Sequence, residues 1–323
     1  MLSELLKGFL PVDVSRMRAG DFLGRQNEIE NVKLRAIEKG GGWKDVRSCP
    51  LCGCARREAE FPKHGVDLVG CLECGLRYGA RIPSNLDDVY KSPEYVSFSK
   101  EDTDDHFNYR RDRFGRERVG ILAKYCGDLT DLKILDIGCG NGYFLAAAKE
   151  SCRRCFGTES SGRLREFAAR KTGLPVFGEE LERLPEKDFD IVTLFDVIEH
   201  VPAPVPFMES VLRLMKSGGR VLVFTPNFDS FSIRVMQARS SIVDPTEHVV
   251  LFTRQSLQYL ADALRLEIIY HETQGLDVQN ILSMEHVAGT DAGKFLARWA
   301  NELQAMINRS SCGDYSRIMY RKA

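Results

Sequence analysis

From residue 127 onward, short apolar runs alternate with stretches of helical periodicity. The apolar runs are LKILDIG, RCFGTES, LPVFGEE, FDIVTLFDV and RVLVFTPN, and the stretches between them include YFLAAAKES, GRLREFAARKTG and PAPVPFMESVLRLMKSGG. Consecutive apolar positions over so short a run are typical of strands that are buried on both faces. Strand and helix in strict alternation predict a doubly wound α/β fold, a parallel sheet with helices on both faces.

The rest of the chain is predicted to form attachments around this sheet. Residues 1–47 carry an amphipathic pattern that predicts a helical arm ending at KGGGW, and residues 48–81 hold short strand-like pieces between two cysteine pairs. Residues 82–126 are predicted to be an acidic, turn-rich connector followed by a lead-in helix. The main domain then spans residues 127–323, with a helical insertion near 277–309 before the closing strand DYSRIMYRK.

Composition changes this picture little, but it argues against some classes of function. The chain has 323 residues, 43% of them hydrophobic and 28% charged, and a formal net charge of -1. These values are typical of an ordinary globular protein and give no support for nucleic acid or an anionic membrane as a partner. Because no apolar stretch reaches the ~20 residues of a membrane helix and the first residues do not resemble a signal peptide, we expect a cytoplasmic protein. Peripheral membrane contact and the oligomeric state are left open.

The sequence ILDIGCGNGYF places three glycines where the first predicted strand meets the first helix. Gly138, Gly140 and Gly142, with Cys139 between the first two, permit a sharp turn and let a ligand approach the backbone at the edge of the sheet. A dinucleotide-binding turn would need its third glycine at position 143, which is a tyrosine. Asp136 at the strand end would repel a diphosphate, so the loop favours a ligand that carries an amine and a positive charge.

S-adenosylmethionine carries both groups, and this loop resembles motif I of the class I S-adenosylmethionine-dependent methyltransferases. The resemblance spans roughly residues 115–323. It implies a seven-stranded Rossmann-like sheet whose last strand is antiparallel. It also implies that S-adenosylmethionine is the methyl donor.

The resemblance extends to further positions that bind the donor in that family. Glu159 ends the second strand, where the family's acid accepts both ribose hydroxyls. GEELERLP resembles the loop whose acid binds the adenine amino group, and either Glu180 or its neighbour Glu179 would fill that role. The backbone around Phe195 and Asp196 would lie against the methionine part.

Transfer of a methyl group to a hydroxyl requires a group that removes the proton. His200 follows the fourth predicted strand in DVIEHVPAP, and His248 lies in PTEHVVLFT beyond the fifth. Both segments line the acceptor side in the family, so either histidine is a candidate base, and a structural role for each remains open. Asp196 and Glu199 are the alternative bases.

Two CxxC pairs stand apart from the predicted sheet. Cys49 and Cys52 are separated from Cys71 and Cys74 by 18 residues, and a glycine follows the second cysteine of each pair. This spacing is typical of a structural Zn²⁺ site with four thiolate ligands, a zinc ribbon, and a redox pair would need only one CxxC. Cys54 is a less suitable ligand than Cys52, and we expect the third pair, Cys152 and Cys155, to be apolar core.

The basic residues do not mark a nucleic-acid interface. Between residues 49 and 81 five Lys and Arg face four Asp and Glu, so the ribbon lacks the excess of positive charge that tracks phosphates. The run of five arginines in the lead-in helix is either an anionic contact or a solvated face paired with its own acids. These arginines are Arg110, Arg111, Arg113, Arg116 and Arg118.

The order of ribbon, lead-in helix and glycine loop resembles bacterial methyltransferases of surface-polysaccharide and sugar metabolism. The leading hypothesis is therefore an enzyme that O-methylates a sugar, glycan or lipid-linked glycolipid precursor, a small-molecule acceptor. An RNA or protein methyltransferase that docks through the ribbon, a sugar C-methyltransferase and a cofactor-binding regulatory protein without turnover are the alternatives.

Overall fold

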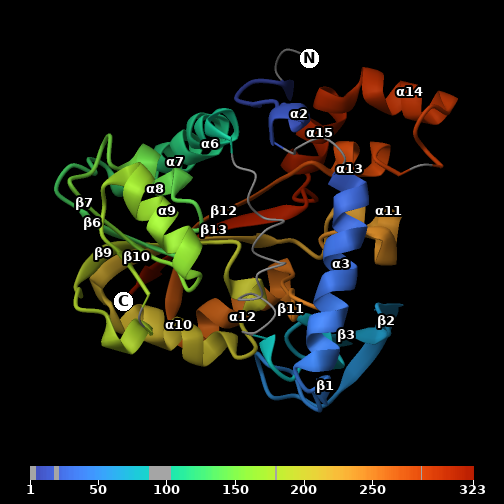
Figure 1. Ribbon diagram of the computed structural model, residues 1–323, viewed down its shortest axis with the longest axis horizontal. Helices are drawn as coiled ribbons and strands as arrows, with labels where there is room; N and C mark the ends of the chain where they lie inside the picture. The colour runs from blue at the N-terminus through green and yellow to red at the C-terminus, as the bar shows by residue number, and fades with distance from the viewer. Residues whose placement is uncertain (1–4, 18–21, 87–102, 179, 285) are drawn as a thin grey trace.

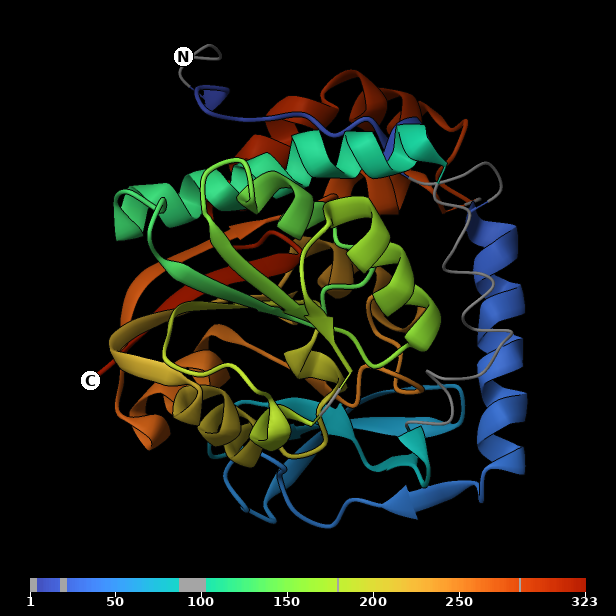
Figure 2. The same ribbon diagram turned by 60° about the vertical axis from the view of Figure 1, so that its left-hand side comes forward.

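The computed structural model describes residues 5–17, 22–86, 103–178, 180–284 and 286–323. Its central element is a seven-stranded sheet in the order β12-β13-β10-β9-β6-β7-β8, seen nearly edge-on in Figure 2. Only β13 runs antiparallel to its neighbours, β10 and β12. The strands are β6 (Lys133–Ile137), β7 (Arg154–Thr158), β8 (Val176–Phe177), β9 (Phe189–Phe195), β10 (Met215–Pro226), β12 (Leu266–Gln274) and β13 (Tyr315–Lys322). The predicted α/β class and the antiparallel last strand are confirmed.

Helices cover both faces of this sheet (Figure 1). On one face lie α7 (Arg116–Cys126), α8 (Tyr143–Ala148) and α9 (Gly162–Thr172), and on the other α10 (Pro204–Arg213) and α12 (Arg254–Leu264). Alternate strand residues enter the two cores: Ile134 and Leu222 pack beneath α7 and α8, whereas Leu135 and Val223 pack against α10 and α12. The helix α6 (Asp104–Arg110) continues into α7 through a π-helical segment, η1 (Arg111–Gly115).

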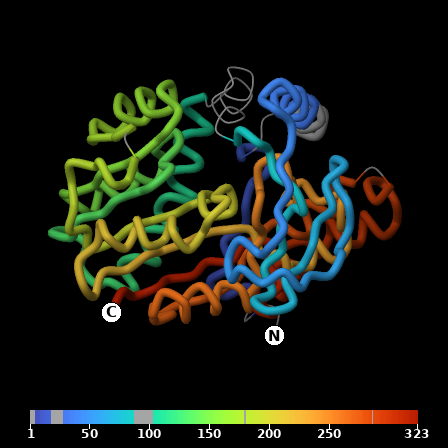
Figure 3. The backbone as a smooth tube through the Cα atoms, turned by 90° about the horizontal axis from the view of Figure 1, so that it is seen from below, coloured from blue at the N-terminus to red at the C-terminus, as the bar shows by residue number. Residues whose placement is uncertain are grey.

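The cysteine-bearing segment forms its own small sheet, which one strand of the main domain completes. Its strands are β2 (Arg57–Lys63), β3 (Val66–Cys71) and β4 (Arg77–Gly79). The strand β11 (Val250–Leu251), which is distant from them in the sequence, pairs with β4. In the tube view this blue and cyan ribbon lies beside the main sheet (Figure 3). A further pair, β1 (Trp43–Asp45) and β5 (Arg81–Pro83), flanks the ribbon.

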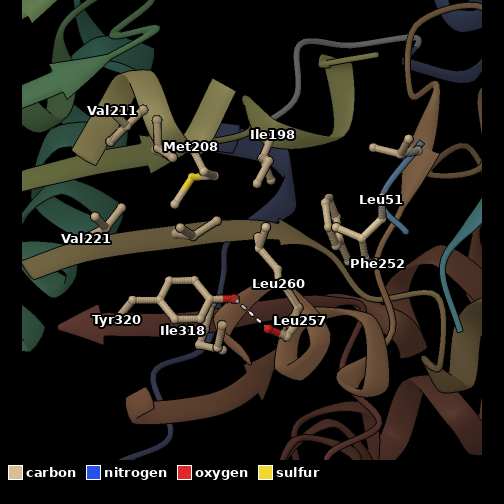
Figure 4. Close-up of a cluster of buried hydrophobic side chains, with 14 of the residues drawn as sticks. Leu51, Ile198, Met208, Val211, Val221, Phe252, Leu257, Leu260, Ile318 and Tyr320 are labelled. Carbon is tan, nitrogen blue, oxygen red and sulfur yellow. Dashed lines mark hydrogen bonds between the residues drawn. The ribbon is translucent and has the colours of Figure 1, made fainter. Parts of the chain in front are cut away.

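The ribbon and the main domain share one hydrophobic core. Leu51 of the ribbon packs beside Phe252 and Leu257, and the same cluster continues to Met208 and Tyr320 under the large sheet (Figure 4). The Tyr320 hydroxyl donates to the Leu257 carbonyl at 3.2 Å, the dashed line in that view. A core that is continuous across both sheets makes the ribbon part of the same folded body.

The N-terminal segment contributes α2 (Val14–Met17) and the long helix α3 (Phe22–Lys39), which stands at the side of the molecule in Figures 1 and 2. Lys33 of α3 is almost fully buried, and its ammonium group lies 2.8 Å from both Asp244 and Glu247. The helix is thereby fixed to the segment that leads into β11.

Three short helices lie between β12 and β13: α13 (Asp277–Leu282), α14 (Asp291–Arg298) and α15 (Ala300–Arg309). They stand above the carboxyl ends of the central strands together with α11 (Phe231–Met236). The shorter 3₁₀ turns are η2 (Leu181–Arg183), η3 (Ile198–His200) and η4 (Gln237–Arg239). Among the described residues, no helix is both long enough and apolar enough to cross a bilayer.

Candidate active site

The glycine loop joins β6 to α8 at the carboxyl edge of the sheet. Gly138, Gly140 and Gly142 have φ values of +68°, +54° and +81°, a backbone region that disfavours side chains. Among the described residues, no atom apart from those of its chain neighbours lies within 4 Å of the position that a Cβ at Gly140 would take. At Gly140 the loop therefore presents bare backbone to open space, as a ligand-binding turn requires. The Cys139 side chain is buried and its backbone N–H donates to the Thr158 carbonyl at 2.9 Å, which ties the loop to β7.

Glu159, just after β7, is held against this loop by both carboxylate oxygens. Oε2 accepts from the Gly140 N–H at 3.0 Å, and Oε1 accepts from the Ser161 N–H at 2.8 Å. The side chain is only partly buried. A carboxylate oxygen accepts more than one hydrogen bond, so Glu159 keeps acceptor capacity toward the open side of the loop.

Asp136 lies beneath the loop, where its carboxyl group is almost fully buried. The Thr193 hydroxyl donates to its Oδ1 at 2.7 Å. Burial raises the pKa of Asp136 to about 7, against the lowering effects of the Thr193 hydrogen bond and the Arg118 charge. A cationic amine at this position would compensate for the cost of ionising the carboxyl group.

Arg118 is a site residue that the sequence did not identify. Its guanidinium lies 4.0 Å from the centre of the Phe195 ring and 5.2 Å from that of Phe224, and it donates to the Tyr143 hydroxyl. Its Nη2 atom is 4.0 Å from Oδ2 of Asp196, whose side chain is 44% exposed. Arg111, Arg113 and Arg116 pair with local acids, and Arg110 donates to the Met17 carbonyl at 3.3 Å. Of the five arginines in the run, Arg118 is the one that is buried. No signal in the sequence distinguishes it from the other four.

The acids expected near the adenine are not both placed. Glu179 lies outside the described residues. Glu180 is exposed and immediately precedes η2, and its carbonyl accepts from the Arg183 N–H at 2.9 Å. The structure brings Asp136, the glycine loop, Glu159 and Asp196 to one edge of the sheet.

The two candidate histidines lie together although they are far apart in the sequence. Their ring centroids are 4.8 Å apart, with His200 in η3 and His248 just before β11. Burial, reinforced by the charge of His248, lowers the pKa of His200 to about 4. Glu199 beside them is fully buried, and burial together with the negative charge of Asp196 raises the pKa of its carboxyl group well above the usual range.

A cavity of about 420 Å³ opens between these groups and the helices after β12. Arg118, Tyr143, Asp196 and His248 are among the residues that line it. Aromatic and amide side chains from the N-terminal arm, the lead-in helix and the 274–315 segment also contribute to its walls. These residues are Phe9, Phe114, Gln274, Gln279, Asn280, Asn301, Gln304 and Tyr315. The cavity therefore adjoins the carboxyl edge of the sheet and is mixed in character, because flat apolar rings and neutral hydrogen-bonding groups lie beside charged ones. The other charged residues in its lining are Arg110, Arg113, Asp314 and Arg317.

The N-terminal arm closes one wall of this cavity. The Arg113 guanidinium donates to the carbonyls of Leu10 and Pro11 and pairs with Glu117 at 3.0 Å. Both Leu10 and Val12 then line the cavity.

The four cysteines of the two CxxC pairs meet in one cluster. Their Sγ atoms all lie within 4.8 Å of one another, with Cys49 and Cys74 3.5 Å apart and Cys52 and Cys71 3.4 Å apart. Cys54 is not a member of this cluster, and its sulfur accepts from the Arg56 N–H at 3.4 Å. Cys152 and Cys155 are buried within the core of the main sheet.

A family model described as "Methyltransferase domain" matches residues 107–271, which is more than half of the chain. The ubiquinone biosynthesis O-methyltransferase of Leptothrix cholodnii is 29% identical over 119 residues, which are 34% of this chain and 51% of that protein. The protein of the same name from Alkalilimnicola ehrlichii is 31% identical over 118 residues, 34% of this chain and 48% of that protein. The chain thus spans about half the length of the curated relatives it matches.

Among solved structures, a SAM dependent methyltransferase from Archaeoglobus fulgidus is similar to 67% of this chain and 99% of its own. Its TM-score is 0.46 and its sequence identity is 22%.

Proposed function

This chain belongs to the methyltransferase-domain family, and from that premise we propose that it transfers the methyl group of S-adenosylmethionine to a hydroxyl group of a sugar, glycan or glycolipid precursor. The observation that carries the proposal is the cavity beside Asp196, which lies where the donor-binding edge of the sheet meets the helices after β12. Donor and acceptor would meet at this junction.

The residues at the sheet edge suit the chemical groups of the donor. Asp136 would receive the α-amino group, the loop around Gly140 would lie against the methionine chain, and Glu159 would accept the ribose hydroxyls. The aromatic ring of Phe195 is buried against Phe144 and Phe224, with ring centroids 4.9 and 5.0 Å away, so its contribution would come from the backbone.

The cavity walls favour a hydroxylated acceptor. Flat rings such as Phe9 and Phe114 offer stacking surfaces, and the amides of Gln279 and Asn301 offer both donors and acceptors of hydrogen bonds. In the reaction the acceptor oxygen attacks the methyl carbon in line with the leaving sulfur, whose bond electrons remain on the thioether product. Positioning of the two reactants supplies much of the rate.

We further propose that the cysteine cluster holds a structural Zn²⁺ ion. Four thiolates around zinc at about 2.3 Å lie ~3.8 Å apart in a tetrahedron, and the sulfur atoms of this cluster already approach that arrangement. The burial of Cys49, Cys71 and Cys74 in the shared core fits a structural role, and none of the four cysteines is among the described residues that line the cavity. Arg56 and Arg77 of the ribbon pair with the acids Glu73 and Glu60, which argues against docking on nucleic acid.

The test is transfer of label from radioactive S-adenosylmethionine to a panel of sugar nucleotides, lipid-linked glycans and RNA. We expect label in the glycan fraction only. Glu159→Gln should lose transfer at low donor concentration, and Glu166→Gln, at an exposed position of α9, serves as the matched control. Label that enters RNA alone would contradict the proposed acceptor class, and donor binding without transfer to any acceptor would favour a regulatory role.

A further inference from the structure

Glu199, His200 and His248 form a second cluster of metal-binding groups, separate from the cysteines. One candidate ligand atom from each of the three lies within 4.8 Å of the other two. Two ligands on opposite sides of an ion at about 2.1 Å are ~4.2 Å apart, so small side-chain adjustments bring all three onto one ion. The residues come from two segments, η3 after β9 and the loop that leads into β11.

Both imidazole rings are oriented as metal ligands usually are. Nδ1 of His200 is 3.1 Å from the Glu247 carbonyl, and Nδ1 of His248 is 2.6 Å from the Ile242 carbonyl. A carbonyl only accepts hydrogen bonds, so each Nδ1 carries the proton and each Nε2 carries the lone pair. A backbone carbonyl on the distal ring nitrogen is the common outer partner of a metal-bound histidine.

The carboxylate of Glu199 supplies an independent indication. Its side chain is 0% exposed, and Oε2 accepts from the Thr225 hydroxyl at 2.9 Å. Oε1 is buried and has no hydrogen-bond partner in the described part of the chain. A buried carboxylate oxygen without a partner is costly, and a cation between it and the two imidazoles would remove that cost.

We propose that Glu199, His200 and His248 bind one divalent transition-metal ion at the wall of the acceptor cavity. Two imidazole nitrogens and one carboxylate suit Zn²⁺, Mn²⁺, Co²⁺ or Fe²⁺ and leave coordination positions open. His248 lines the cavity, as does the neighbouring Asp196, so the proposed site adjoins the space in which the acceptor would bind.

The chemical role of this ion rests on the methyl transfer proposed above. An acceptor hydroxyl bound to the ion would release its proton to water in the cavity at a lower pH. The resulting oxyanion forms the new O–C bond as the C–S bond breaks, and that electron pair stays on sulfur. No electron is gained or lost by the metal. In this arrangement the two histidines act as ligands rather than as the base expected from the sequence.

The proposal is tested by metal binding to the full chain, with its cysteine-bound metal in place and with donor and acceptor absent. Titration with Mn²⁺ followed by electron paramagnetic resonance, and with Co²⁺ followed by visible absorption, should show one saturable site per chain. We expect Glu199→Gln and His248→Ala each to raise its Kd at least tenfold. His286→Ala removes an exposed histidine and should leave the Kd unchanged.

We use one variant at Glu199 and one at His248 so that the test remains decisive if one of them does not fold. Glu199→Gln keeps the shape and the Thr225 contact, so it remains informative if His248→Ala does not fold. If the wild-type chain has no saturable site for either ion, or if folded Glu199→Gln binds as tightly as wild type, the metal site is wrong. Metal binding is measured without substrates, so the absence of methyl-transfer activity would not contradict the metal site. Methyl transfer by a chain that binds no metal at this site would contradict the metal site but not the proposed methyl transfer.

Discussion

At the scale of single residues, the fold and the proposed chemistry favour opposite protonation states of the Asp136 carboxyl group. Its burial beneath the glycine loop favours the neutral acid, as the pKa of about 7 shows. The amine of the donor favours the carboxylate. A buried acid whose pKa is higher in the folded than in the unfolded chain stabilises the protein below its unfolded pKa, and that stability is lost as the pH rises through 7.

Asp136→Asn should therefore weaken donor binding without lowering the stability of the fold. A hydrogen bond to a charged group contributes about 1.5–3 kcal/mol, so we expect the variant to bind S-adenosylmethionine at least ~10-fold more weakly at pH 8. Its free energy of unfolding at pH 8 should be equal to or higher than that of wild type. The wild-type affinity, measured by calorimetry, should fall as the pH is lowered from 8 to 6. An affinity independent of both pH and the substitution would place the donor's amine elsewhere.

At the scale of elements, the lead-in helix shows why regular helical periodicity does not predict which of its arginines face the protein interior. The π-helical segment η1 adds a residue to one turn and shifts the faces of α6 and α7 relative to each other. Gly115 allows this segment to approach α8 closely, since a Cβ there would lie 2.9 Å from that of Ala147. Arg113 then reaches the N-terminal arm and Arg118 reaches the Phe195 ring.

Helix α3 depends on one buried ammonium group. Lys33→Met removes the partner of Asp244 and Glu247 and leaves two buried carboxylates without their cation, so we expect a loss of about 3–5 kcal/mol in the free energy of unfolding. Lys39→Met, at an exposed position of the same helix, should change it by less than about 0.5 kcal/mol. Urea unfolding measures both. Equal effects of the two substitutions would contradict the role of the buried ion pair.

At the scale of the whole molecule, the ribbon and the large sheet are joined by backbone pairing, side-chain hydrogen bonds and a shared core. The strand β11 completes the ribbon sheet, the Thr253 hydroxyl donates to the Gly75 carbonyl at 3.1 Å, and the Gln255 amide donates to the Glu73 carbonyl at 3.1 Å. The start of α12 is thus bonded to the second cysteine knuckle. Residues of the large sheet and of the cysteine cluster belong to the same core.

Loss of the metal ion that we propose at the cysteine cluster should consequently destabilise the entire chain. We expect Cys74→Ser to lower the temperature of a single calorimetric transition and to weaken donor binding at temperatures near that transition. Cys54→Ser, which alters a thiol outside the cluster, is the matched control and should unfold as wild type does. Two separate transitions in Cys74→Ser, with the upper one unchanged, would instead show that the ribbon unfolds independently.

The order of strands and helices in the main domain could be predicted from the sequence, because burial on both faces of a parallel sheet leaves a repeating local pattern. The sequence also placed Asp136, the glycine loop and Glu159 together, since the carboxyl ends of parallel strands share one edge of the sheet. The spacing of the CxxC pairs similarly identified four cysteines that the structure brings within 4.8 Å of one another.

Which distant groups meet at buried positions depends on the packing of whole elements and could not be predicted from the sequence. The pairing of Lys33 with Asp244, the contact of His200 with His248, the burial of Arg118 and the addition of β11 to the ribbon all join segments far apart along the chain. Such contacts leave no local periodicity, because a buried polar group is satisfied by whichever partner the packing of whole elements brings to it. The acceptor cavity, whose walls come from both ends of the chain, arises in the same way.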